Sequence, residues 1–292
     1  MRSEREMFDL ILRVAREDER IRAAYLNGSR ANPSAPRDCF QDYDVVYVVQ
    51  NIAPYRETPK WIDVFGPRLM LQEPERMDAE AGDLAALNGL NSCYGYLMLF
   101  ADGNRIDLHL MTPKAALAEY GQDSQTVPLL DKDGLLPALP PPSDRSYWVR
   151  KPEQALFAQC CNNFWWCMQN VAKGICRGEL PYAKAMLEQV ERPELDCMVN
   201  WWIGLQHGFA VSPGKLGKYF SLYLPAGLWA QYEQTYQGAG CAEQWKAVFA
   251  ACNLFGCLGR EVGAALGYLY PQQDEDAMTA YLRRLHNGDT AV

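Results

Sequence analysis

The sequence lacks the features that mark secreted, membrane-spanning and zinc-binding proteins. No stretch approaches the roughly 18 consecutive apolar residues of a membrane span, and residues 1–6 carry charges where a signal peptide needs an apolar stretch. The ten cysteines include no Cys-x-x-Cys pair, and the three histidines are scattered. We therefore expect reduced thiols, no zinc site, and a cytoplasmic protein without a membrane partner.

Two nucleotide-binding fingerprints are also missing, and positive charge is scarce. Neither a Gly-x-x-x-x-Gly-Lys-Ser/Thr loop nor a Gly-x-Gly-x-x-Gly turn occurs. The chain has 28 Lys and Arg against 36 Asp and Glu, a net charge of −8. Because nucleic-acid backbones are bound by clustered Lys and Arg, this balance disfavours a nucleic-acid partner. It favours cationic small molecules, although acidity also serves solubility alone.

The front half of the chain alternates predicted strands and helices. Residues 3–19 show the period of an amphipathic helix. Buried strands are expected at residues 23–27, 40–49 and near 68–71, and a β-hairpin at 94–110 turns at Asp102-Gly103.

The back half is predicted to be helical. Four prolines within residues 136–143 cannot continue a helix or a central strand, so they form a linker. Beyond it, apolar residues between Trp245 and Val262 recur at three- and four-residue steps. The expected fold class is α+β, with a sheet-containing domain over residues 1–143 and an all-helical domain over 144–292.

Three aspartates and one turn are the candidate functional residues. Asp42 and Asp44 stand at i and i+2 of a predicted strand, so their side chains point to the same face. Gly28-Ser29 follows the first strand, and Asp107 lies on the later hairpin. A Gly-Ser pair alone is a common turn, but two like charges on one strand face repel unless they are solvated or bind metal.

This combination suits phosphoryl or nucleotidyl transfer, which needs charge neutralisation on phosphate and an in-line nucleophile. Asp42 and Asp44 are expected to bind the Mg²⁺ ion that holds a triphosphate. Asp107 would complete the site of a second ion or accept the proton of the attacking hydroxyl. Gly28 lets the backbone approach the phosphates and Ser29 donates to them, whereas Arg30 is either a further contact or a surface charge.

The same residues carry a resemblance to known families. Three segments resemble motifs of the DNA polymerase β-type nucleotidyltransferase superfamily: Gly28-Ser29-Arg30-Ala31-Asn32, Asp42-Tyr43-Asp44 and Arg105-Ile106-Asp107-Leu108. Three further segments resemble the aminoglycoside 6-adenylyltransferases, the streptomycin adenylyltransferases of bacteria. They are Cys161-Asn162-Asn163-Phe164-Trp165-Trp166, Leu180-Pro181-Tyr182-Ala183-Lys184 and Gly214-Lys215-Leu216-Gly217-Lys218-Tyr219. The resemblance runs from about residue 3 to about residue 285.

The resemblance implies a fold and a function. It implies a mixed sheet with flanking helices, then a helical substrate-binding bundle, with the active site in a cleft between the two. It also implies transfer of AMP from Mg-ATP, with two Mg²⁺ ions, to the 6-hydroxyl of the streptidine ring of streptomycin, which inactivates the antibiotic. Asp107 is then the favoured base, and positions that match the family motifs are expected to contact the triphosphate: Lys184, Lys215, Lys218 and Tyr219.

Two other readings stay open at this stage. One is a nucleotidyltransferase that acts on another small molecule, a protein or RNA, although the acidic composition weakens the RNA version. The other is a nucleotide-binding module without turnover, which would have no need of Asp107. For the drug-modifying reading we expect a monomer whose partners are ATP and a cationic aminoglycoside.

Overall fold

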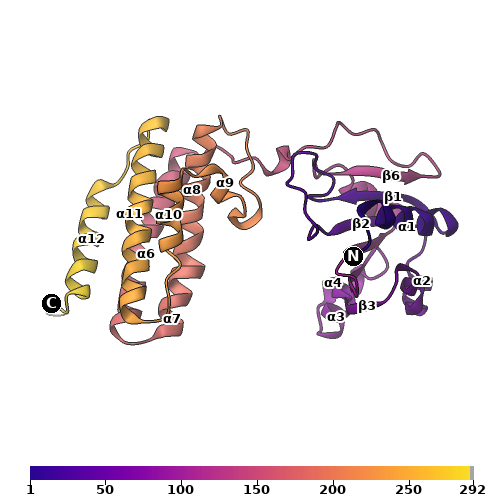
Figure 1. Ribbon diagram of the computed structural model, residues 1–292, viewed down its shortest axis with the longest axis horizontal. Coiled ribbons are helices and arrows are strands. Elements are labelled where there is room, and N and C mark those ends of the chain that lie inside the picture. Colours follow the sequence, from indigo (N-terminus) through magenta and orange to yellow (C-terminus); the bar gives the residue numbers. More distant parts are fainter. Residues whose placement is uncertain (290–292) are drawn as a thin grey trace. The chain divides into compact units, whose positions relative to one another are not determined.

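The chain divides into two units, and the computed structural model describes residues 1–289. The first unit spans Met1–Ser146 and the second Tyr147–Val292 (Figure 1). The sequence-based boundary lay after residue 143. Strands occur only in the first unit among the described residues, and the second is helical, which confirms the α+β fold class.

One six-stranded sheet organises the first unit, in the order β3-β4-β5-β2-β1-β6. β2 and β5 are parallel and the other neighbours are antiparallel, so the sheet is mixed as expected. The predicted hairpin is formed by β4 and β5. The strands are β1 (Ile21–Asn27), β2 (Tyr43–Val49), β3 (Arg68–Gln72), β4 (Cys93–Phe100), β5 (Arg105–Met111) and β6 (Val127–Asp131).

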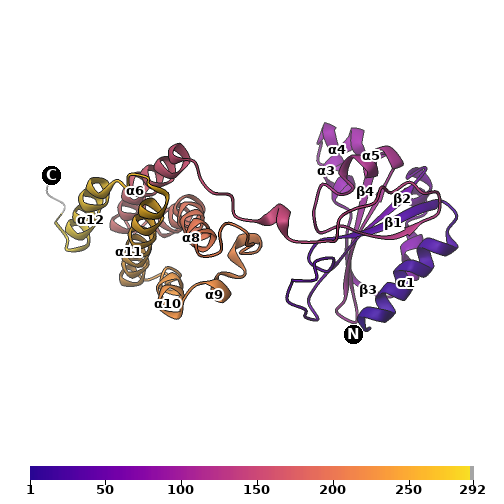
Figure 2. The ribbon, with the colours of Figure 1, turned by 90° about the horizontal axis from the view of Figure 1, so that it is seen from above.

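The two faces of the sheet are covered differently (Figure 2). Helix α1 (Glu4–Glu17) begins with a capping box at Ser3 and packs Met7 and Ile11 against one face. The Tyr47 hydroxyl donates to the Ile11 carbonyl at 2.6 Å and fixes α1 on β2. The opposite face is partly covered by α5 (Pro113–Glu119).

Short helices complete the first unit. They are α2 (Ala53–Glu57), the 3₁₀ segment η1 (Pro59–Phe65), α3 (Pro74–Glu80) and α4 (Leu84–Gly89). The 3₁₀ turn η2 (Arg145–Tyr147) spans the boundary with the second unit.

The predicted strand 40–49 is too long at its start. β2 begins at Tyr43, so Asp42 lies in the preceding loop and not on the strand. Two observations explain this. Phe40 is 83% exposed, and the carbonyl oxygens of Gln41 and Asp42 accept hydrogen bonds from Arg30 instead of joining the ladder.

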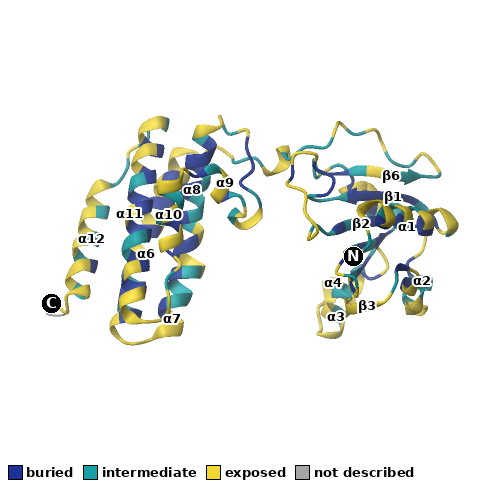
Figure 3. Cartoon of the chain, in the orientation of Figure 1, coloured by how far each residue is buried: buried dark blue, intermediate teal, exposed yellow. Residues whose placement is uncertain are grey.

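The second unit is a bundle of helices with its own core (Figure 3). The apolar pattern predicted between Trp245 and Val262 lies in α11, which confirms that helix. The elements are α6 (Gln154–Cys176), α7 (Leu180–Ala185), the π segment η3 (Met186–Glu191), α8 (Arg192–Gln206), η4 (Lys215–Gly217), α9 (Phe220–Tyr223), α10 (Ala226–Gln234), α11 (Cys241–Leu266) and α12 (Gln272–His286). No helix within residues 1–289 has the length and apolar character that spanning a bilayer requires.

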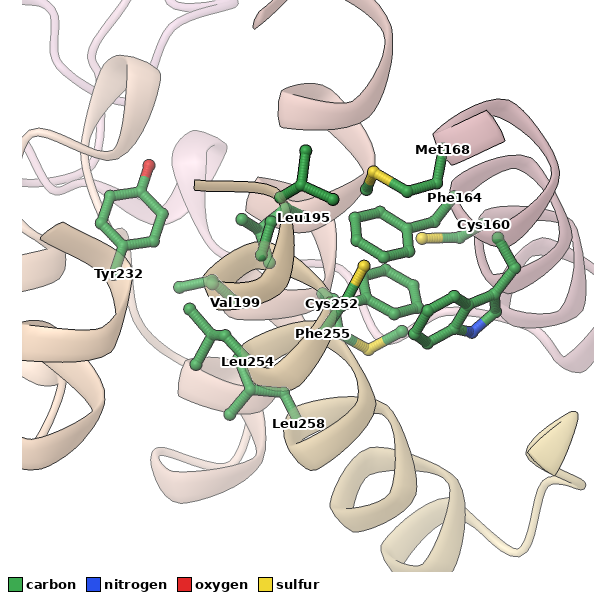
Figure 4. Close-up of a cluster of buried hydrophobic side chains, with 14 of the residues drawn as sticks. Cys160, Phe164, Met168, Leu195, Val199, Tyr232, Cys252, Leu254, Phe255 and Leu258 are labelled. Atoms are coloured by element: carbon green, nitrogen blue, oxygen red, sulfur yellow. The ribbon is translucent and has the colours of Figure 1, made fainter. Parts of the chain in front are cut away.

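Aromatic stacking joins the two longest helices (Figure 4). Phe164 of α6 stacks on Phe255 of α11 with ring centroids 3.8 Å apart and planes 3° apart. Both side chains are fully buried. Buried aromatic rings make large contributions to core stability, and such pairs add to their area burial.

We expect Phe164→Ala to lower the free energy of unfolding of the helical unit by about 3–5 kcal/mol, because the truncated side chain leaves a cavity in a close-packed core. Urea unfolding followed by circular dichroism measures this. Trp166→Ala is the matched control, since Trp166 lies on the same helix and is 67% exposed. Equal losses in the two variants would contradict the assigned core.

Candidate active site

The turn after β1 brings the backbone against Asp44. Gly28 has φ of 76°, in the left-handed region that favours glycine. The turn is closed by a hydrogen bond of 3.0 Å from the Ala31 amide to the Gly28 carbonyl. A Cβ atom at Gly28 would lie 2.2 Å from Oδ2 of Asp44. Glycine is therefore required here for both conformation and space.

Strand pairing brings Asp44 and Asp107 side by side. The two residues are direct partners in the parallel pairing of β2 with β5. Their neighbours Val45 and Leu108 are buried on the face that packs on α1. Because side chains alternate along a strand, both carboxylates point to the opposite face.

The Asp44 carboxylate is electrostatically disfavoured. Burial, and then the negative charges of Asp107 and Asp42, raise its pKa to about 6. Burial raises the pKa of Asp42 as well, while the charge of Arg105 opposes that increase. The cluster therefore holds more negative charge than its surroundings neutralise.

Arg105 forms ion pairs with two carboxylates of this cluster. Its Nε and Nη2 atoms each lie 2.7 Å from a different oxygen of Asp107. Its Nη1 atom lies 3.5 Å from Oδ2 of Asp42. Sequence reasoning assigned no role to Arg105, although its position two residues before Asp107 on one strand was a usable signal.

The predicted convergence of the three carboxylates on one ion is not formed in this arrangement. Within residues 1–289, no three His, Cys, Asp or Glu side chains are gathered closely enough to hold a metal ion. Asp107 faces the Arg105 guanidinium instead. The predicted metal site therefore stays a prediction.

The donor set nevertheless fits a divalent cation. Among the described residues, the Asp44 carboxylate makes no hydrogen bond and no ion pair. It lies among like charges that raise its pKa. Carboxylate oxygens are the ligands that Mg²⁺ prefers, and one or two of them suffice when water and phosphate fill its shell.

Arg30 holds the loop that carries Asp42. Its guanidinium donates to the carbonyls of Gln41 and Asp42 and to Glu4 of α1, and it lies 3.9 Å from the ring centroid of Tyr43. At 7% exposure it is not a surface charge. These partners give Arg30 a positioning role in the structure, and the phosphate contact considered above stays a prediction.

The remaining predicted contacts are in several places. Ser29 is half-buried in the turn next to Gly28. In the helical unit, the Lys184 ammonium donates to the Gln237 carbonyl at 2.8 Å. Lys215 and Lys218 are exposed, and Lys218 lies 5.0 Å from the ring centroid of Tyr219.

The structure does not bring all four helical-unit residues together. Lys184 lies in α7, at the lower end of the unit in Figure 1, whereas the segment 215–219 directly precedes α9 near the upper end. The Val149 amide donates to the Val211 carbonyl, four residues before this segment, and ties that part of the chain to the start of the unit. Lys215, Lys218 and Tyr219 are therefore neighbours, and Lys184 is separate from them.

The raised pKa of Asp44 predicts a pH-dependent stability. Since the folded pKa exceeds the ordinary value of 3.8, the native state binds this proton more tightly, and stability falls as pH rises from about 4 through about 6. In EDTA, Asp44→Asn should therefore be more stable than the wild type at pH ~7, by up to about 3 kcal/mol. Below pH ~4 the difference should vanish. Urea unfolding across this range tests it, and a pH-independent difference would refute the assignment.

Comparisons with known proteins agree with the motifs. The family model described as streptomycin adenylyltransferase matches residues 1–285. An aminoglycoside 6-adenylyltransferase of Bacillus subtilis (strain 168) is 37% identical over 287 residues, covering 98% of this chain and 99% of that protein. One of Campylobacter jejuni is 37% identical over 285 residues, covering 97% and 96%.

A crystal structure of an aminoglycoside 6-adenyltransferase from Bacillus subtilis aligns with a TM-score of 0.48 and 33% identity, over 98% of this chain and 99% of that one. The family match and the curated relatives confirm the resemblance inferred from the motifs. This chain belongs to the streptomycin adenylyltransferase family.

Proposed function

We propose that this protein transfers AMP from ATP to a hydroxyl group of an aminoglycoside, namely the 6-hydroxyl of the streptidine ring of streptomycin, and so inactivates the antibiotic. Relatives that match nearly the whole chain are named aminoglycoside 6-adenylyltransferases, which supports the reaction class. The observation that carries the proposal is the alignment of Asp44 with Asp107, beside the Gly28 turn.

The residues of the first unit would divide the work. Two Mg²⁺ ions, when bound to Asp42, Asp44 and Asp107, would neutralise the triphosphate and polarise the reacting oxygens. The backbone amides of Gly28 and Ser29 would donate hydrogen bonds to phosphate oxygens. Asp107 would accept the proton of the attacking hydroxyl.

The bond changes balance without any further reactant. The hydroxyl oxygen of the acceptor bonds to the α-phosphorus, and the bond from that phosphorus to the pyrophosphate oxygen breaks. The hydroxyl proton goes to a carboxylate oxygen of Asp107, and pyrophosphate leaves. Positioning and charge stabilisation supply most of the rate in such transfers.

The rest of the proposal concerns the second unit and the partners. Residues 1–143 would be the catalytic domain and residues 144–292 the substrate-binding domain, with the neighbouring Lys215, Lys218 and Tyr219 as triphosphate contacts. The contact predicted for Lys184, which lies apart from these three, stays a prediction. Streptomycin carries two guanidinium groups, which pair well with carboxylates, and the chain has a net charge of −8. We further propose a monomer that acts in the cytoplasm without nucleic acid.

A panel of aminoglycosides, each tested with the four nucleoside triphosphates and Mg²⁺, tests this function. Pyrophosphate release should depend on streptomycin and ATP together. Asp44→Asn should lower the rate roughly a thousandfold or more, because the charge stabilisation at such a site is worth several kcal/mol. Its circular dichroism should match the wild type. Nucleotide binding without turnover on any aminoglycoside would instead support a non-catalytic module.

Gly28→Ala should also abolish turnover, because its Cβ would displace the Asp44 carboxylate and strain the turn. Gly134→Ala separates the two effects. Gly134 has a similar φ of 67° but no atom within 4 Å of its added Cβ. Both variants should lose about 1 kcal/mol or more of stability, and only Gly28→Ala should lose activity. Equal activities would show that the close approach to Asp44 has no catalytic consequence.

A further inference from the structure

Arg105 occupies the oxygens that the proposed reaction needs. Both oxygens of Asp107 accept hydrogen bonds of 2.7 Å from its guanidinium. The third nitrogen, Nη1, reaches Oδ2 of Asp42 at 3.5 Å. One side chain thus spans two of the three carboxylates assigned to metal binding.

The pairing at Asp107 is the most complete contact in this cluster. Its fork-on-carboxylate geometry is the strongest form of Arg–Asp pairing. A metal ion that takes Asp107 as a ligand requires at least one of the same oxygens. The guanidinium and the metal ion therefore compete for Asp107.

One partner of the Arg105–Asp107 ion pair is accessible to solvent. The Arg105 side chain is 44% exposed, whereas that of Asp107 is 14% exposed. Water can solvate the guanidinium when it leaves the carboxylate, so releasing this pair costs less than separating two buried charges. Arg105 precedes Asp107 by two residues on one strand face, so its released guanidinium stays beside the cluster.

We propose that Arg105 is an exchangeable internal cation, which holds Asp107 and Asp42 and must release Asp107 before a divalent cation binds there. The inference rests on the proposed function, because it takes Asp42 and Asp107 as metal ligands. Arg105 is on this account a positioning residue. It sets the affinity of the site for metal, since a protein that must first leave a favoured state binds its ligand more weakly.

Metal binding to the whole chain measures this competition directly. Mn²⁺ serves as the probe, and electron paramagnetic resonance counts the free ion. Arg105→Gln removes the competing group and should bind Mn²⁺ about tenfold more tightly than the wild type, which corresponds to about 1.4 kcal/mol. Saturating Mn²⁺ should also raise its Tm by more than it raises that of the wild type.

Arg105→Lys separates occupation of the oxygens from simple charge repulsion. Lysine keeps the positive charge but cannot grip both oxygens of Asp107 and Asp42 at once. It should therefore bind Mn²⁺ several-fold more tightly than the wild type does. If its affinity equals that of the wild type, charge alone explains the effect and the exchange is overturned.

Arg22→Gln is the matched control. Arg22, which lies on β1, also forms a bidentate pair with one carboxylate, that of Asp133. Its loss should leave Mn²⁺ affinity unchanged, because neither residue belongs to the cluster. A similar rise in this control would show that removing any arginine raises cation binding, which overturns the inference.

The outcomes separate the two levels of the proposal. Unchanged Mn²⁺ affinity in both Arg105 variants, with loss of binding in Asp44→Asn, overturns the exchange and leaves the metal site standing. Failure of the wild type and every variant to bind Mn²⁺ overturns the metal assignment and the exchange together. Tighter binding in both Arg105 variants, and not in Arg22→Gln, supports both.

Discussion

The parallel pairing of β2 with β5 sets Asp44 directly beside Asp107, and the electrostatics of the candidate site depend on this juxtaposition. Like charges opposite each other on neighbouring strands are destabilising unless something neutralises them. The effect is visible in the raised pKa of Asp44, which burial causes first and the neighbouring carboxylates increase. A site in this condition favours any cation that can reach it, whether a metal ion or a guanidinium.

Two arginines manage this charge in different ways. Arg30 is buried and uses its donors on backbone carbonyls and on Glu4, which fixes the loop before β2 and sets the position of Asp42. Arg105 is half-exposed and pairs with the carboxylates themselves. The first arrangement has many partners and resists change, whereas the second has one partner in contact with water, so it separates at a lower cost than a pair of two buried charges. The difference in burial between Arg30 and Arg105 distinguishes an arginine with a structural role from one that can respond to a ligand.

Much of this was available from the sequence, because the relevant signals are local. Asp102-Gly103 marked the hairpin, and strand periodicity placed Asp44 and Asp107. Contacts distant in sequence were not available. Asp42 leaves the strand because Arg30 takes the carbonyls around it, and β6 escaped notice because Pro128 weakens its strand pattern, although proline is tolerated on an edge strand. Helical periodicity gave no indication that Lys184 and Lys215 lie apart, since it fixes faces and not the order in which helices pack.

The two faces of the sheet explain how such a site is tolerated. On the face that carries α1, buried residues such as Val45, Tyr47 and Leu108 alternate with the acidic positions and form a continuous core. Burial of apolar surface there offsets the repulsion on the other face, where Asp44 and Asp107 sit beside a turn without side chain at Gly28. Side chains alternate between the two faces of a strand, so the neighbours of each acidic residue point to the packed face. This alternation keeps the charged face and the apolar face apart. The same sheet thus carries one face that is packed and apolar and another that is charged, and any cation bound at the charged face adds to stability.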